Sequence, residues 1–277
     1  MSVEFRTDIQ HFRRGPKSIW IAAGVGVFSF YQRIKEMFFF ILIVLGVYVK
    51  KRRSSRRVII PLIYQEISKC GLTPLPIILF LSCVIGFLVV GQSAIFLGLI
   101  GDASSSLIGN ILVLVIFKEI GPLLAALVLL VRVGVSTVVE LAGERASGQV
   151  EWLCSLGIDP VHYYVVPRAI GMGVATLCLT IYLITFAFIS GYAVVFFMDI
   201  PWKPMEYLDQ IVAALKWKDF LILFLKAMLF GSLIAITTCY ESLAHPVLSH
   251  QIPATIIRVV IGCLIGWGII DVLFYFI

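Results

Sequence analysis

Charged residues are scarce in this chain: they make up 14% of its 277 residues, whereas hydrophobic residues make up 60%. A soluble domain averages about 25% charged and about 45–50% apolar residues. The shortage of charge therefore excludes an ordinary soluble domain. Apolar runs recur between polar breaks, and their length of about 20 residues suits membrane-spanning helices rather than barrel strands. We therefore expect an all-α integral membrane protein.

Motifs for catalysis and for nucleotide or metal binding are also missing. The sequence has no GxxxxGK[ST] loop to hold ATP phosphates, no GxSxG motif and no HExxH motif. Its six cysteines include no CxxC pair, and its four histidines show no metal-ligand spacing. Most of the excess positive charge lies near the N-terminus, which indicates membrane topology rather than a nucleic-acid site. We expect no metal site, no cofactor bound by this chain and no catalytic residues.

The N-terminal segment, 1–73, is expected to stay on the cytoplasmic side of the membrane. Its apolar runs 19–30 and 37–49 are each too short to cross about 30 Å of hydrocarbon, which favours one or two interfacial helices. A single tilted span is the alternative, but it would bury the charged residues between the two runs. Residues 50–57 contain six cations, which anchor this segment in the cytoplasm.

A five-span membrane domain is expected to follow, over residues 74–277. Its predicted spans are 74–100, 107–131, 165–198, 220–239 and 254–277. With the N-terminus in the cytoplasm, the C-terminus lies on the outer side. Residues 132–168 and 240–253 are then cytoplasmic, with Glu241 in the second of these loops.

The cytoplasmic segment between the second and third spans favours one helix over 138–156. Most of its residues are good helix formers, Gly157 suits a C-cap, and Pro160 ends the segment. Such a helix suits docking into a groove on another protein. An ordinary surface helix that joins two spans is the alternative, and the residues alone leave both open.

Glu119 is a carboxylate inside the second apolar run. A charged residue at this depth faces a protein interior or a wet cavity and marks function by default. Its cationic partner is expected to be Arg132 or a residue of a second subunit, because the adjacent Lys118 points to a different face of the helix. The alternative is a purely structural contact between helices. Asp271 is expected to lie at the outer membrane interface.

Residues 117–168 resemble the signature region of the MlaE/YrbE permease family, the membrane subunits of MCE-type ABC lipid transporters. The resemblance rests on Lys118, Glu119, Ile120, Gly121, Pro122, Arg132, Gly134, Glu140, Leu141, Ala142, Gln149, Leu156, Gly157, Ile158, Asp159, Pro160, Pro167 and Arg168. Ser147 and Gly148 stand where the family commonly has Thr and Glu before Gln149. The resemblance is therefore to a divergent member.

This resemblance implies a homodimeric permease in the bacterial inner membrane, a transport subunit rather than an enzyme. It implies a cytoplasmic ABC ATPase partner that binds ATP and Mg²⁺, an MCE-domain protein on the outer face and, in some systems, a STAS-domain subunit. The substrates would be phospholipids or other hydrophobic molecules moved between the inner membrane and the outer envelope. The residues expected to couple to the ATPase are Glu140, Glu144, Arg145, Gln149, Leu153, Leu156, Gly157, Asp159 and Pro160.

Two copies of such a permease would enclose a lipid pocket walled by their first two spans. The candidate wall residues are Phe87, Val90, Gly91, Ile95, Leu112, Ile116 and Glu119. Two other functions stay open. One is an ion- or proton-coupled carrier that uses Glu119 as its titrating group without an ATPase. The other is a scaffold that transports nothing.

Overall fold

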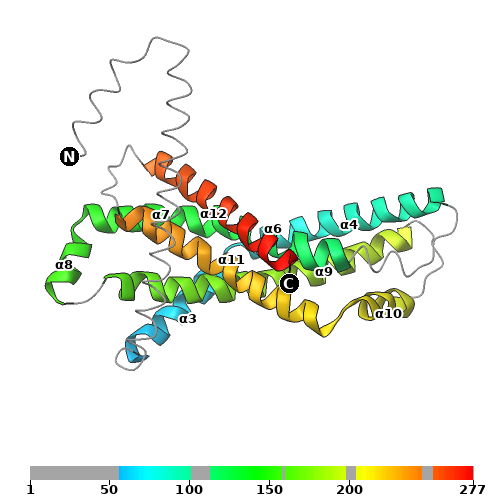
Figure 1. Cartoon of the computed structure of the whole chain (residues 1–277), viewed down its shortest axis with the longest axis horizontal. Coiled ribbons are helices and arrows are strands. Elements are labelled where there is room, and N and C mark those ends of the chain that lie inside the picture. The colour runs from blue at the N-terminus through cyan, green and yellow to red at the C-terminus, as the bar shows by residue number, and fades with distance from the viewer. Residues whose placement is uncertain (1–55, 101–112, 158–159, 198–203, 245–251, 277) are drawn as a thin grey trace, which may run out of the picture. The chain divides into compact units, whose positions relative to one another are not determined.

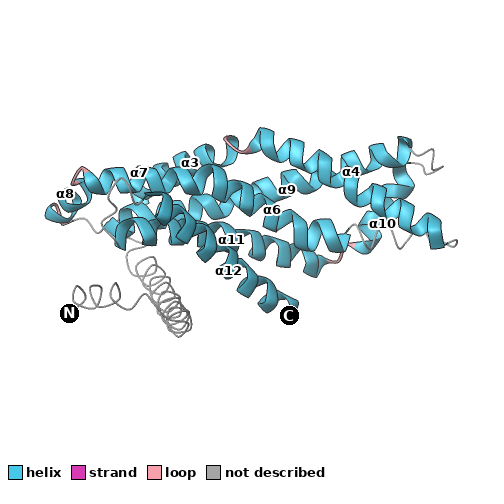
Figure 2. Cartoon of the chain, turned by 90° about the horizontal axis from the view of Figure 1, so that it is seen from above, coloured by secondary structure: helices cyan, strands magenta, loops and turns pink. Residues whose placement is uncertain are grey.

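The computed structural model describes residues 56–100, 113–157, 160–197, 204–244 and 252–276 (Figure 1). The expected interfacial helices within 19–49 lie outside these residues. All described helices belong to one compact unit, Val47–Ile277, so α3 (Arg56–Leu72) is part of the same unit as the spans. The described residues form helices and no strands (Figure 2), which confirms the all-α fold.

Five helical stretches are long and apolar enough to cross a membrane, as the sequence predicts. They are Leu75–Gln92, Leu114–Ala146, Val161–Val194, Trp217–Leu243 and Ile252–Tyr275. The helices that carry them are α4 (Leu75–Ile100), η1 (Val113–Ile120) with α6 (Gly121–Leu129), η2 (Leu130–Gly134) and α7 (Val135–Ala146), η3 (Val161–Val165) with α9 (Val166–Phe197), α11 (Trp217–Ala244) and α12 (Ile252–Tyr275).

The second span continues further than the sequence indicates. It was predicted to end at 131, but helical structure runs on through Arg132 to the end of α7. The predicted single helix over 138–156 is therefore wrong. Gly148 has a φ of 76° and separates α7 from a second helix, α8 (Gln149–Ser155). The chain turns here because glycine adopts this left-handed conformation at no steric cost.

The fourth span also extends beyond its predicted end at 239. No glycine or proline interrupts the sequence from Ser232 to Ala244, and α11 continues to Ala244. Glu241 therefore lies on this helix and is buried, rather than in a cytoplasmic loop as predicted. A short helix, α10 (Pro204–Ala214), lies within the segment predicted to be an external loop.

Helix α9 is the centre of the bundle, packed against α3, α4, α6 and α11. Figures 1 and 2 both show it running from the end of the bundle near α8 to the end near α10. We call these the α8 end and the α10 end. Small residues allow the close approach, as is common between membrane helices. A Cβ on Gly231 of α11 would overlap the Met172 carbonyl and the Thr176 hydroxyl of α9.

We expect Gly231→Val to destabilise the bundle, because the added side chain forces α11 away from α9. Overpacking of this kind costs about 1–3 kcal/mol or more. The measurement is the apparent melting temperature of the purified protein in detergent, which should fall by several degrees. Gly262→Val on α12 is the matched control, since a Cβ there meets nothing within 4 Å. Equal melting temperatures for the two variants would contradict the packing described.

Candidate functional site

Helix α8 is exposed at one end of the bundle (Figure 1). It lies between two glycines in the left-handed conformation, Gly148 with a φ of 76° and Gly157 with a φ of 74°. None of its residues is buried, and the side chain of Trp152 is 75% exposed. Leu156, directly after the helix, is 66% exposed. The aromatic side chain of Trp152 and the aliphatic side chain of Leu156 are thus both exposed on one short stretch of chain.

The residues predicted to couple to an ATPase divide into two groups. Gln149, Leu156 and Gly157 are exposed on residues 149–157, which we call the α8 segment. Leu153 on this segment and Pro160 beyond it are partly buried. Glu140, Glu144 and Arg145 lie instead on α7, where they make contacts within the chain. Arg145, for example, donates a hydrogen bond to the Leu243 carbonyl of α11. Asp159 lies outside the described residues.

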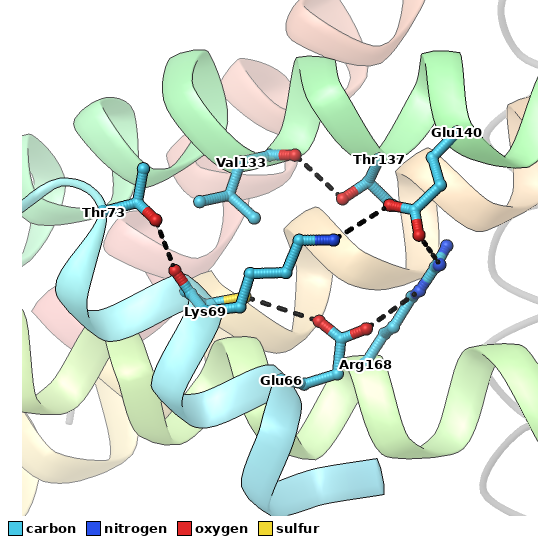
Figure 3. A network of polar contacts seen from close by, with 8 residues as sticks. Glu66, Lys69, Thr73, Val133, Thr137, Glu140 and Arg168 are labelled. Carbon is cyan, nitrogen blue, oxygen red and sulfur yellow. Dashed lines mark hydrogen bonds and ion pairs between the residues drawn. The ribbon is translucent and has the colours of Figure 1, made fainter.

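A network of ion pairs joins α3, α7 and α9 at the α8 end (Figure 3). The buried guanidinium of Arg168, near the start of α9, lies 3.4 Å from Glu66 on α3 and 3.4 Å from Glu140 on α7. Lys69 of α3 pairs with Glu140 at 3.2 Å. Three helices are thus tied to one another by charge.

Cys70 lies beside this network. Burial and the nearby Glu66 carboxylate raise the pKa of the Cys70 thiol to about 12, so this cysteine stays protonated at neutral pH.

A second charged cluster lies toward the α10 end. The ammonium group of Lys226, on α11, is 3.0 Å from Glu119 and 2.8 Å from Asp271 of α12. It also donates to the Lys118 carbonyl at 2.9 Å. The Lys118 side chain pairs with Asp219 at 2.8 Å. The adjacent residues Lys118 and Glu119 therefore face different partners, as their spacing on a helix requires.

Within the chain, Glu119 pairs with Lys226 and not with Arg132, which is exposed. The other expected partner, a residue of a second subunit, stays a prediction. Asp271 was expected at the outer interface, and the structure shows it paired with the same lysine. Sequence reasoning missed Lys226 altogether. The signal was present, because a lysine in the middle of an apolar span is itself a sign of a buried partner.

The candidates for a lipid-pocket wall are spread over the first two spans. Val90 and Ile116 are buried, and Phe87 is 59% exposed. Gly91 lies against Val194 of α9, and the side chain of Glu119 is 55% exposed. The Ile95 side chain and Leu112 lie outside the described parts of the structure. Their role in a pocket between two copies stays a prediction.

An apolar cavity of about 700 Å³ lies between η1, α9, α10 and α11. Buried side chains form its floor, among them Phe117, Ile184 and Leu223. Ile189 and Phe224 are half-exposed or more and border its open side. The other lining residues are Leu177, Ile181, Thr185, Phe188, Tyr192, Ile211, Leu215 and Phe220. Its size is within the range of about 300–1,000 Å³ found for small-molecule sites, and its walls suit a hydrophobic molecule.

We expect Lys226→Met to destabilise the protein, because it leaves Asp271 and Glu119 without their shared cation. Removing one partner of a buried ion pair costs about 3–5 kcal/mol, and the half-exposed Glu119 will lower that cost by regaining water. Thermal unfolding in detergent should show a clear loss for Lys226→Met and a smaller one for Lys226→Arg. Arg258→Gln, at an exposed position of α12, is the control. A Lys226→Met protein as stable as wild type would show that the cluster contributes nothing.

Comparison with known proteins agrees with this architecture. The family model described as Permease MlaE matches residues 63–277. A probable ABC transporter permease protein of Rickettsia prowazekii (strain Madrid E) is 29% identical over 180 residues, covering 65% of this chain and 68% of the relative. Another of Rickettsia felis is 31% identical over 181 residues, with the same coverage. One of Synechocystis is 33% identical over 137 residues, covering 49% of this chain and 51% of the relative. The chain, with its five spans, therefore belongs to the MlaE permease family.

Proposed function

We propose that this permease is the membrane subunit of an ABC transporter that moves phospholipids or other hydrophobic molecules, driven by ATP hydrolysis on a partner protein. Family membership supports the permease role, and the related proteins from Rickettsia and Synechocystis carry the name of probable ABC transporter permeases. The observation that carries the proposal is the exposure of Trp152 and Leu156 on a short helix bounded by two left-handed glycines.

The α8 segment has the properties of a docking site for the ATPase. Tryptophan is enriched among the residues that dominate binding energy at interfaces. Gly148 and Gly157 fix the turns at either end of the segment. An ATPase bound here would hold α8 and, through it, the end of the second span. In this proposal the α8 end therefore lies in the cytoplasm. The six cations of 50–57 favour the same orientation, because clusters of Lys and Arg stay on the cytoplasmic side of a membrane.

The hydrophobic substrate is supported by the chemistry of the bundle. The 700 Å³ cavity is apolar, with Thr185 and Tyr192 as its polar lining residues. The first and fifth spans, Leu75–Gln92 and Ile252–Tyr275, are the least buried, with 28% and 22% of their residues buried against 50% in each of the other three. In this proposal a second copy of the chain covers these two spans. In this proposal two copies stand side by side in the inner membrane. The α10 ends then meet an MCE-domain protein on the outer face, and a STAS-domain subunit belongs to the complex only where the ATPase binds one.

Trp152→Ala combined with Leu156→Ala should release the ATPase without unfolding the permease. Truncating central interface residues of this kind typically costs about 2 kcal/mol or more each, so we expect about a tenfold or greater loss of bound ATPase. The measurement is the amount of ABC ATPase that co-purifies with tagged permease from native membranes, identified by mass spectrometry. Tyr275→Ala, at an aromatic that is 87% exposed near the end of α12, is the matched control. Undiminished ATPase in the double variant would contradict docking at α8.

A further inference from the structure

Arg168 is incompletely satisfied in the arrangement that the structure shows. Its side chain is 94% buried, yet both of its carboxylate contacts are 3.4 Å long. Well-formed pairs between a guanidinium and a carboxylate are about 2.7–2.9 Å. The guanidinium also interacts with the thiol of Cys239 on α11, which is a weak acceptor. Its Nη1 atom is buried and has no hydrogen-bond partner among the described residues. Leaving a donor of a buried guanidinium without an acceptor costs free energy. Another carboxylate nearby would therefore compete with Glu140 for Arg168.

Glu144 is the carboxylate that can compete with Glu140. It lies on α7, one turn beyond Glu140, and its Oε2 atom is also buried with no hydrogen-bond partner in the described part of the chain. Tyr164 lies next to both Arg168 and Glu144. The centroid of its ring is 5.8 Å from the Cζ atom of Arg168, and its hydroxyl interacts with Glu144. An unfilled donor on α9 and an unfilled acceptor on α7 therefore share a neighbour.

The spacing on α7 offers Arg168 two equivalent carboxylates. Residues four apart on a helix lie on the same face, about 6 Å apart along its axis. A shift of α7 along α9 by up to one turn would therefore replace Glu140 by Glu144 at the guanidinium. One-turn shifts of one packed helix past another are an established form of conformational switching.

The same guanidinium also holds α3. Glu66 of α3 contacts the Nε atom of Arg168, and Lys69 of α3 contacts Glu140 of α7 (Figure 3). Only Thr73 and Pro74 separate α3 from α4, which is the first span. A change in the contacts of Arg168 therefore affects three helices. They are α7, which leads into α8, the central helix α9, and α3, which leads into the first span.

We propose that Arg168 is a positioning residue that exchanges Glu140 for Glu144 when α7 moves, and that it thereby passes movement of the α8 segment to α3 and the first span. The exchange itself needs only this chain. Its use in transport rests on the proposed function, in which the ATPase moves α8.

The experiment measures the distance between α7 and α9 in the full chain in lipid nanodiscs. Spin labels are placed on Gly143→Cys, where an added Cβ meets nothing within 4 Å, and on the native, exposed Cys178 of α9. The other exposed cysteines, Cys83 and Cys154, are replaced by serine. Double electron–electron resonance gives the distance distribution for this labelled parent and for its Glu140→Gln and Glu144→Gln variants.

The two glutamine variants should differ, with a shifted distance in Glu140→Gln and the parental distance in Glu144→Gln. Glu140→Gln weakens the contact that the structure shows, so the main distance should shift by several ångströms, up to about the 5.4 Å of one turn. Glu144→Gln removes the alternative partner, so only the parental distance should remain. Lys69→Gln is the matched control, because it breaks an exposed contact of Glu140 without touching Arg168, and it should leave the distance unchanged. Identical distributions for Glu140→Gln and the parent would overturn the exchange, as would the same shift in Glu144→Gln.

Adding the ATPase separates this inference from the proposed function. In the assembled complex, ATP should populate the shifted distance in the parent but not in Glu144→Gln, and Glu144→Gln should move lipid at least tenfold more slowly than the parent. If Glu140→Gln shifts the distance but ATP and the ATPase do not, the exchange stands and the proposed ATPase coupling fails. If ATP shifts the distance equally in Glu144→Gln, coupling stands and the exchange is wrong.

Discussion

A charge buried among apolar helices must find an opposite charge, and this constraint organises the structure at both ends. Lys226 holds Glu119 and Asp271 together, which ties the second, fourth and fifth spans toward the α10 end. Arg168 holds Glu66 and Glu140, which ties α3, α7 and α9 toward the α8 end. Buried pairs add little net stability, but breaking one is expensive. They therefore fix which helices lie together more than they strengthen the bundle.

The two clusters differ in how completely they are satisfied, and the difference fits their places in a transporter. The ammonium group of Lys226 has two carboxylates and a backbone carbonyl, all within 3.0 Å. Arg168 has two contacts of 3.4 Å and a spare donor. A cation with close partners on several sides resists rearrangement, whereas one with long contacts and a spare donor is more easily rearranged. The loosely paired cluster is the one that adjoins α7 and the exposed α8 segment, where movement would enter.

The sequence predicted what depends on local composition. The five spans could be predicted because long apolar runs must lie in the membrane however the helices pack. The family could be predicted from the order and spacing of the motifs within residues 118–168. It did not predict where helices end: Arg132 and Tyr240 looked like exits from the membrane, but nothing in the backbone stops a helix at either residue. The turn at Gly148 was missed because its neighbours on both sides favour helix. The partners of Glu119 and Arg168 could not be read from spacing at all, since Lys226 lies 107 positions from Glu119, and Glu66 lies 102 positions from Arg168. Glu140 lies on a different helix from Arg168.

Whether ATP drives this permease is the central question, because a proton-coupled carrier built on Glu119 would use the same charged residues for a different purpose. The most direct measurement is the movement of a fluorescent phospholipid in proteoliposomes that contain the permease together with its co-purifying ATPase and the MCE-domain protein proposed as its partner. The account predicts movement that requires ATP, is lost with an ATPase unable to hydrolyse it, and is unaffected by collapsing a pH gradient. Movement that follows a pH gradient without ATP would contradict it.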